Sequence, residues 1–195
     1  MFQISAQEKY MFHRFGLADG SYESLQSMRL ETDSNQFFMV GLTADSLTSS
    51  WNLVSLKVNK DSITALKRLF SIDSNMILGA QGTAFAHNGK YVGGGLVSFQ
   101  EQIAAAIFKY DPNSGDTVFC KYLEKDSMTR FRQGKLAHDG NYIFIGQTTE
   151  FDFLGNFYVV KIDTLGQVIW ERRYGTPYYD NGLSINLTPD GGYVL

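Results

Sequence analysis

The chain repeats itself at an interval of 51 or 52 residues, and this repeat constrains the fold more than any other feature. The lysines Lys57, Lys109 and Lys161 stand 52 residues apart, each after an apolar residue and before an apolar residue and Asn or Asp. An Asn-Gly or Asp-Gly pair recurs 51 residues apart at 88–89, 139–140 and 190–191, and a tyrosine follows each pair in phase. Because several independent positions hold one register, the chain is built from one supersecondary unit used repeatedly.

Within one repeat the local signals are those of strands and tight turns. Asp139-Gly140-Asn141 separates two strand-like runs, and Asp163-Thr164-Leu165-Gly166 separates the next two. Glycine supplies the positive φ that such hairpin turns require. The composition agrees, because the chain is 14% aromatic and has 19 glycines but only 3 prolines. The alanines at 104–106 favour a helix locally, but their place in the repeat predicts a strand there.

Four strands per repeat predict an all-β fold, namely a β-propeller of four-stranded antiparallel blades. The expected blades span residues 26–71, 80–123 and 132–174, a partial blade spans 182–195, and residues 9–16 form a terminal outer strand. This single domain, 1–195, amounts to about three and a half blades in an incomplete ring. We therefore expect the chain to be a fragment whose remaining blades belong to the same polypeptide.

The repeat resembles known propeller families at specific positions. Tyr91-Val92-Gly93-Gly94 and Tyr110-Asp111-Pro112 resemble kelch-type blades, and Trp170 corresponds to the kelch tryptophan, although only one repeat has the double glycine. Residues 156–195 resemble the propeller repeats of large secreted proteins from Bacteroidetes-type bacteria, which often end in a type IX secretion sorting domain. The resemblance implies an extracellular or cell-surface protein, and Ser5-Ala6-Gln7 resembles the end of a signal peptide.

Charge and composition exclude several classes of function. The net charge of −3 argues against nucleic acid as a partner, because nucleic-acid binding usually needs a clustered basic face. The sequence contains no run of 18 apolar residues, so it predicts no transmembrane segment. The single cysteine, Cys120, excludes an intramolecular disulfide and a cysteine-based zinc cage. We expect no catalytic residues, no metal site and no cofactor.

Several motifs that could carry chemistry have a simpler structural explanation. His87 and His138 lie 51 residues apart beside a hairpin turn, which predicts hydrogen bonding there rather than metal binding. Ser114-Gly115-Asp116-Thr117 is similar to the Asp-box of sialidases but lacks the glycine and tryptophan that should follow, so it predicts a turn. Asp180 and the other aspartates between blades, Asp19, Asp73 and Asp126, favour turn formation over calcium binding.

The predicted topology places the tight turns at one end of the blades and the longer, variable connections at the other. Binding residues concentrate on variable loops carried by a rigid scaffold. The expected loops hold the aromatic residues Phe99, Phe151, Tyr178 and Tyr179, which we predict to bind a glycan or a protein partner. The alternative is that some of them, Tyr178 and Phe153 above all, pack one blade against the next.

Two hypotheses for the function remain at this point. The first is a non-enzymatic extracellular module for recognition or scaffolding. The second is part of a carbohydrate-active propeller enzyme whose catalytic residues lie in blades that are not present here. The first strand of each predicted blade offers apolar or small residues and no carboxylate pair, which favours recognition.

Overall fold

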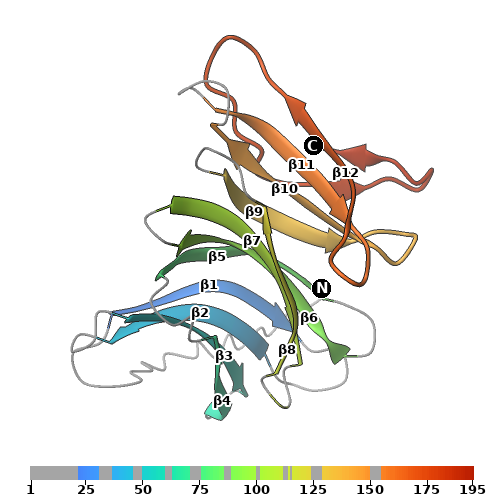
Figure 1. The fold of residues 1–195 in the computed structure, drawn as a ribbon. Coiled ribbons are helices and arrows are strands. Elements are labelled where there is room, and N and C mark those ends of the chain that lie inside the picture. The colour runs from blue at the N-terminus through green and yellow to red at the C-terminus, as the bar shows by residue number, and fades with distance from the viewer. Residues whose placement is uncertain are drawn as a thin grey trace, which may run out of the picture.

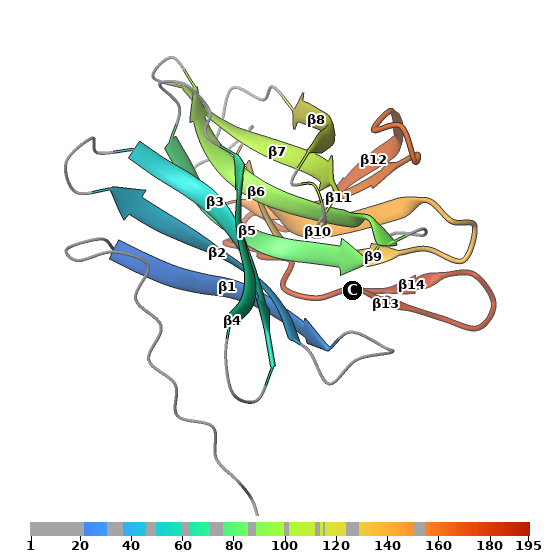
Figure 2. The same ribbon diagram turned by 90° about the horizontal axis from the view of Figure 1, so that it is seen from below.

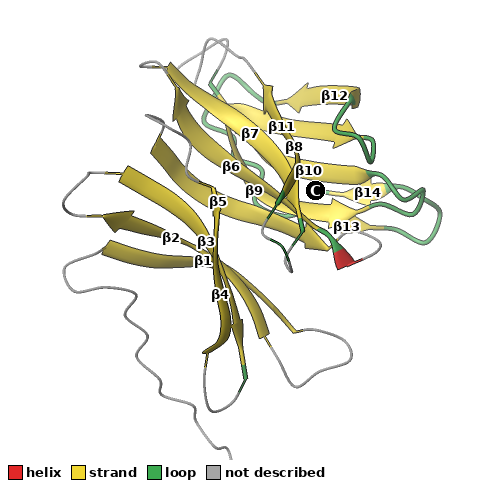
Figure 3. Ribbon diagram, turned by 60° about the horizontal axis from the view of Figure 1, so that its bottom comes forward, coloured by secondary structure: helices red, strands yellow, loops and turns green. Residues whose placement is uncertain are grey.

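The part of the chain that the structure describes consists mainly of antiparallel strands. The structure, a computed structural model, describes residues 22–30, 37–45, 50–59, 63–70, 76–85, 89–99, 102–111, 114, 116–123, 129–149 and 155–195. Within these ranges the regular elements are β-strands, apart from a short turn at Gly89 that is drawn in red in Figure 3. Accordingly, no helix in the described part is long and apolar enough to cross a membrane. The prediction of an antiparallel all-β fold is confirmed.

The strands form three four-stranded sheets and one hairpin. The first sheet comprises β1 (Tyr22–Leu30), β2 (Phe37–Asp45), β3 (Ser50–Val58) and β4 (Ile63–Phe70). The second comprises β5 (Met76–Phe85), β6 (Tyr91–Phe99), β7 (Gln102–Tyr110) and β8 (Thr117–Leu123). The third comprises β9 (Thr129–Leu136), β10 (Tyr142–Thr148), β11 (Asn156–Ile162) and β12 (Val168–Tyr174), and β13 (Asn186–Leu187) pairs with β14 (Tyr193–Val194).

Each four-stranded sheet is a simple meander in which every strand pairs with its neighbours in sequence. Successive connections therefore alternate between two ends of the third sheet (Figure 1). We call the end with the connections 137–141 and 163–167 the tight-turn end, and the end with 149–155 and 175–185 the loop end. Gly140 and Gly191 occupy equivalent turns with φ of 80° and 85°, as expected for glycine in these hairpins.

The repeated lysine has the same place in every sheet. Lys57, Lys109 and Lys161 are each the second-to-last residue of a third strand. Their pairing partners on the second strand are Phe38, Val92 and Ile143, and on the fourth strand Ala65, Phe119 and Trp170. Positions that repeat in the sequence therefore occupy equivalent positions in the three sheets, as the repeat predicts.

A bulge in the first strand also recurs, and it explains a recurring glycine on the second strand. The pairing register shifts within β1, β5 and β9, in each case opposite a glycine-containing part of the second strand. In the third sheet the bulge brings the backbone of Arg130 so close to Gly146 that a Cβ atom there would lie 1.9 Å from the Arg130 carbonyl oxygen. Only glycine fits a backbone approach of this kind.

Consecutive sheets stack face to face, and the core lies between them (Figures 1 and 2). The first strands lie next to one another, because β5 packs on β1 as well as on β9. Between the second and third sheets a fully apolar cluster joins Val92 and Ile107 to Phe131, Phe144 and further buried residues, namely Ala105, Leu123, Tyr142, Tyr158, Val160 and Ile162. The other face of the third sheet packs on the hairpin through Ile143, Ile145, Val159 and Ile185.

Some sequence-based boundaries need correction. The predicted loop that holds Phe99 is short, because β6 continues to Phe99 and pairs there with Gln102. Phe99 is therefore the last residue of a strand rather than part of a long loop. The segment opening at Gly182 becomes a strand only at Asn186. The predicted terminal strand 9–16 lies outside the described residues.

Candidate functional site

The segment between β12 and β13 gives the loop end its best-described surface. Residues 175–185 leave the end of β12 and return to the first strand of the hairpin. Asp180 organises this segment, because its Oδ2 accepts hydrogen bonds from the backbone nitrogen of Thr176 (2.6 Å) and from the Thr176 hydroxyl (2.8 Å). The Thr176 hydroxyl oxygen in turn accepts a hydrogen bond from the backbone nitrogen of Tyr178 at 3.2 Å. The prediction that Asp180 is a turn-forming residue is confirmed.

The same segment is fastened to the end of the third sheet. The backbone nitrogen of Asp180 donates to the carbonyl oxygen of Gly155 at 3.1 Å, just before β11 begins. The Tyr179 hydroxyl donates to Oε1 of Gln147, near the end of β10, at 3.3 Å. Gly175 lies so close to Asn156 that a Cβ atom would meet Oδ1 at 1.7 Å. These contacts hold the backbone of the segment against the strand ends.

Two tyrosines stand out from this fixed backbone. The side chain of Tyr178 is 76% exposed and that of Tyr179 is 61% exposed. Tyr178 and Tyr179, two of the four predicted ligand residues, are thus both exposed on this segment, and Tyr178 does not pack between sheets. Residues 174–185 contain no Lys, Arg, His or Glu, and Oδ2 of their one carboxylate, Asp180, is bound by Thr176. Within this segment the two rings are therefore accompanied by one charged side chain.

The other two predicted ligand residues are placed differently. Phe99 belongs to the second sheet, at the end of β6. Phe151 lies outside the described residues, as does Phe153. The structure therefore brings together Tyr178 and Tyr179 only. Sequence reasoning missed Gln147 and Thr176, which hold the tyrosine segment in place; the Thr-x-x-x-Asp spacing of 176–180 is the signal that could have revealed the second of them.

Polar side chains on the first strand of the third sheet hold the next hairpin. Oε1 of Gln133 accepts a hydrogen bond from the backbone nitrogen of Ile185 at 2.7 Å. Nζ of Lys135 donates to Oδ1 of Asn186 at 2.6 Å. Nε2 of His138 lies 3.0 Å from the carbonyl oxygen of Thr188; because a carbonyl only accepts, this ring nitrogen carries the proton. His138 is thus a hydrogen-bonding residue at a hairpin end, as predicted.

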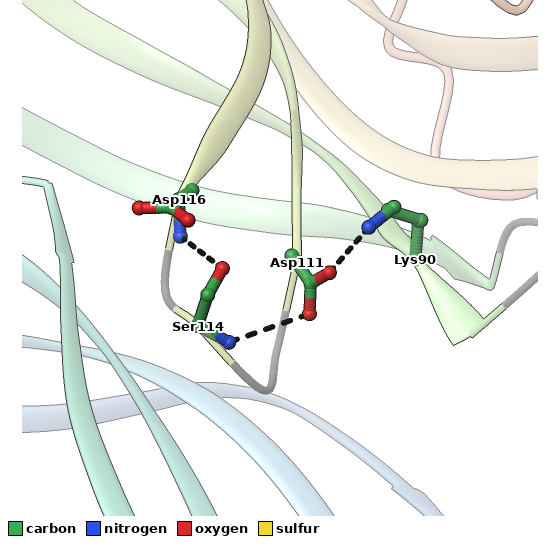
Figure 4. A network of polar contacts seen from close by, with 4 residues as sticks. All are labelled: Lys90, Asp111, Ser114 and Asp116. Carbon is green, nitrogen blue, oxygen red and sulfur yellow. Dashed lines mark hydrogen bonds and ion pairs between the residues drawn. The ribbon is translucent and has the colours of Figure 1, made fainter.

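The motif that is similar to an Asp-box is a turn in this protein (Figure 4). The backbone nitrogen of Ser114 donates to Oδ1 of Asp111 at 3.4 Å, and the backbone nitrogen of Asp116 donates to the Ser114 hydroxyl oxygen at 3.1 Å. Asp111 also forms an ion pair with Lys90. The carboxylate of Asp111 therefore closes the connection between β7 and β8, in agreement with the prediction of a turn.

The single cysteine lies on β8, the outer strand of the second sheet, and is partly buried. Burial raises the pKa of the Cys120 thiol, although a hydrogen bond with Tyr122 works in the opposite direction. The pKa of Tyr122 is raised to about 12, first by burial and then by the neighbouring thiol. Because the thiolate is the nucleophile and the metal ligand, a thiol of raised pKa is poorly suited to either role at neutral pH.

Metal ligands do not converge in the described ranges. No group of three or more His, Cys, Asp or Glu side chains with the geometry to hold a metal ion occurs there.

The ion pair between Asp139 and Lys161, at 2.6 Å, joins the tight turn of β9–β10 to β11. The hydrogen bond from Lys161 holds the pKa of Asp139 below its usual value, against the opposing effect of burial. This pair has a structural explanation.

Comparisons with known proteins give a weak likeness of fold. No protein-family model matches the chain, and no curated protein matches it. Among solved structures, the chain is similar to hydrazine synthase from Kuenenia stuttgartiensis, with 14% sequence identity and a TM-score of 0.39. The match covers 84% of this chain and 52% of that one, so this chain spans about half the length of that structure. At this similarity no chemistry is transferred.

Proposed function

We propose that each four-stranded sheet is one blade of a β-propeller and that β13 and β14 open a further blade. Three observations support this architecture. Each sheet is a sequential meander, the first strands of consecutive sheets lie side by side, and the repeated lysine holds one register in every sheet. The kelch-like motifs of the sequence agree with it, and a propeller presents all its loop ends on one face.

We further propose that the protein is a non-enzymatic recognition module that works outside the cell. The observation that carries this proposal is the pair Tyr178 and Tyr179, exposed on a segment that is hydrogen-bonded to the ends of β10 and β11. Aromatic side chains anchor binding because each buries a large area and loses little conformational freedom. A segment that is already fixed pays less ordering entropy when a ligand binds.

The polar groups of the third sheet favour recognition over catalysis. Contacts with the next hairpin are made by Gln133, Lys135 and His138, so these side chains stabilise the packing of the sheets. An extracellular location rests on the resemblance of residues 156–195 to repeats of large secreted bacterial proteins. The proposed ligand surface is the loop end, with Tyr178 and Tyr179 as its anchors.

The test compares two double variants that remove exposed apolar side chains from opposite ends of the third sheet. Tyr178→Ala/Tyr179→Ala alters the loop end, whereas Leu165→Ala/Val168→Ala alters the tight-turn end. Both variants and the unaltered protein are screened against immobilised glycans and purified extracellular proteins. The proposal expects a ligand that is lost with the first variant and kept with the second. Equal binding by both variants would contradict it.

A further inference from the structure

We infer that the ligand of the loop-end surface is an uncharged polysaccharide whose sugar rings stack on Tyr178 and Tyr179. This inference rests on the proposed recognition function and names the chemical class of its ligand. It is drawn from the charge, the side-chain composition and the exposure of residues 174–185.

The charge of the segment argues against an anionic ligand. Recognition of carboxylate, sulfate or phosphate groups uses arginine or lysine, because these side chains provide charge-assisted hydrogen bonds. Residues 174–185 contain neither. The nearby arginines of β12 are directed to other partners: Arg172 donates to the carbonyl oxygen of Glu171, and Arg173 lies over the ring of Tyr158 at 5.6 Å. One further cation, Arg130, begins the loop end of β9 and is partly buried.

The segment has a single carboxylate, that of Asp180, which is partly buried. Its Oδ2 accepts two hydrogen bonds from Thr176 and so serves to fix the backbone. One such acid offers a cationic ligand little to bind on this segment. An uncharged ligand that offers hydroxyl groups and C–H faces fits the surface better than either kind of ion.

The exposed rings fit a sugar in size and in chemistry. A pyranose presents a flat face of C–H groups that packs on an aromatic face, while its hydroxyl groups remain at the rim and in water. Two consecutive tyrosines supply two such rings, and most residues on either side of the pair are small or polar, namely Gly175, Thr176, Pro177, Asn181 and Gly182. A standard protein–protein interface buries about 800 Å² per partner around an apolar centre, which is much more than two rings provide.

Leu183 distinguishes the two classes of ligand within the same segment. Its side chain is 66% exposed, only four residues after Tyr179. A protein partner large enough to form a stable interface would cover this leucine together with the tyrosines. A sugar chain stacked on the tyrosine rings needs only the rings, so Leu183→Ala is the matched control.

The experiment is affinity electrophoresis of the whole chain in gels that contain one polysaccharide each. The uncharged probes are xyloglucan, mannan, starch and a β-1,3-glucan, and the anionic probes are alginate and polygalacturonate. We expect retardation by at least one uncharged polysaccharide and by neither anionic one. Tyr178→Ala should weaken binding about tenfold, as expected for the loss of one stacking contact. Tyr178→Trp should retain binding, and Leu183→Ala should leave it unchanged.

The outcomes separate this inference from the proposed function. Retardation by the anionic probes alone, by no probe, or with equal strength in Tyr178→Ala would overturn the assignment to an uncharged polysaccharide. If a purified extracellular protein binds instead and is lost in both Tyr178→Ala and Leu183→Ala, the recognition surface stands and its ligand is a protein. If no ligand depends on Tyr178 or Tyr179, the proposed function fails as well.

Discussion

The contact between Lys161 and the hairpin β13–β14 offers the sharpest test of how consecutive sheets are joined. The Lys161 side chain is only 12% exposed; its Nζ donates to Oδ2 of Asp139 at 2.6 Å and lies 5.8 Å from the centre of the Tyr193 ring. The same contact occurs one repeat earlier, where Lys109 lies over the ring of Tyr142 at 5.5 Å. Lys161→Met keeps the aliphatic part of the side chain and removes only the charge.

The expected loss follows from the two contacts. Asp139 is about half exposed (49%), so the ion pair contributes only about 0.3–0.5 kcal/mol. The interaction of the ammonium group with the Tyr193 ring contributes about 0.5–1 kcal/mol. Only the second contact joins the hairpin, because Lys161 and Asp139 both belong to the third sheet. Lys161→Met should therefore weaken the docked hairpin by about 0.5–1 kcal/mol, which corresponds to a factor of about two to five in its opening equilibrium.

Hydrogen exchange over residues 186–194 measures this local opening, because amides exchange through the least costly opening that exposes them. Lys161→Met should speed exchange in this hairpin about two- to fivefold and leave β9 and β10 nearly unchanged. Lys121→Met, on the outer strand β8, is the control for loss of a lysine charge. Exchange of the hairpin at the unaltered rate in Lys161→Met would refute the role of the contact, as would an equal increase in the Lys121→Met control.

Four further predictions address the core, the bulge, the ion pair and the thiol. Phe144→Ala should lower the free energy of unfolding in urea by about 3–5 kcal/mol, because the ring is fully buried between two sheets; a loss below 1 kcal/mol would contradict the stacking. Gly146→Ala should lower the free energy of unfolding more than Gly191→Ala. A Cβ atom at position 146 would lie 1.9 Å from a backbone oxygen, whereas one at position 191 would meet no atom within 4 Å and would incur only the roughly 1–2 kcal/mol of a left-handed φ. The opposite order would contradict the bulge. The lowered pKa of Asp139 means that its stabilisation is present above about pH 4 and is lost as the pH falls through the lower folded value; the free energies of unfolding of Asp139→Asn and of the unaltered chain should therefore converge towards pH 2. Burial raises the pKa of Cys120, so iodoacetamide at pH 7.5 should alkylate it more slowly in the folded than in the urea-unfolded chain; equal rates would argue against its burial.

The sequence predicts the fold to the extent that the repeat reports local structure. Turns with glycine at positive φ, such as those at Gly140 and Gly191, depend on residues close in sequence, and the structure has them where they are expected. The equivalent placement of the repeated lysine follows because a strand has a fixed period of two and one register slip would reverse every side chain. The helix favoured locally by the alanines at 104–106 does not form, since pairing on both sides of β7 outweighs propensity.

Contacts between repeats were not predictable in the same way. The partner of Lys161 on the next hairpin, Tyr193, lies 32 residues further along, and nothing local to either residue signals the contact. β6 extends to Phe99, where a loop is predicted, because cross-strand pairing rather than turn residues sets the connection to β7. Likewise, the hydrogen bond between Tyr179 and Gln147 joins the segment after β12 to strand β10, and only the folded meander brings them together.

These contacts give the two ends of a repeat different structural roles. At the tight-turn end, Lys161 and His138 contact the next hairpin and Asp139 pairs with Lys161, so a substitution there disturbs the stacking of sheets. At the loop end, Asp180 fixes the backbone through its own segment and through one carbonyl group of the sheet. The side chains of Tyr178 and Tyr179 then remain largely exposed on a backbone that does not depend on the Tyr178 ring. A surface built in this way changes its ligand by exchanging one or two side chains while the sheets stay as they are, which is why we place recognition at the loop end.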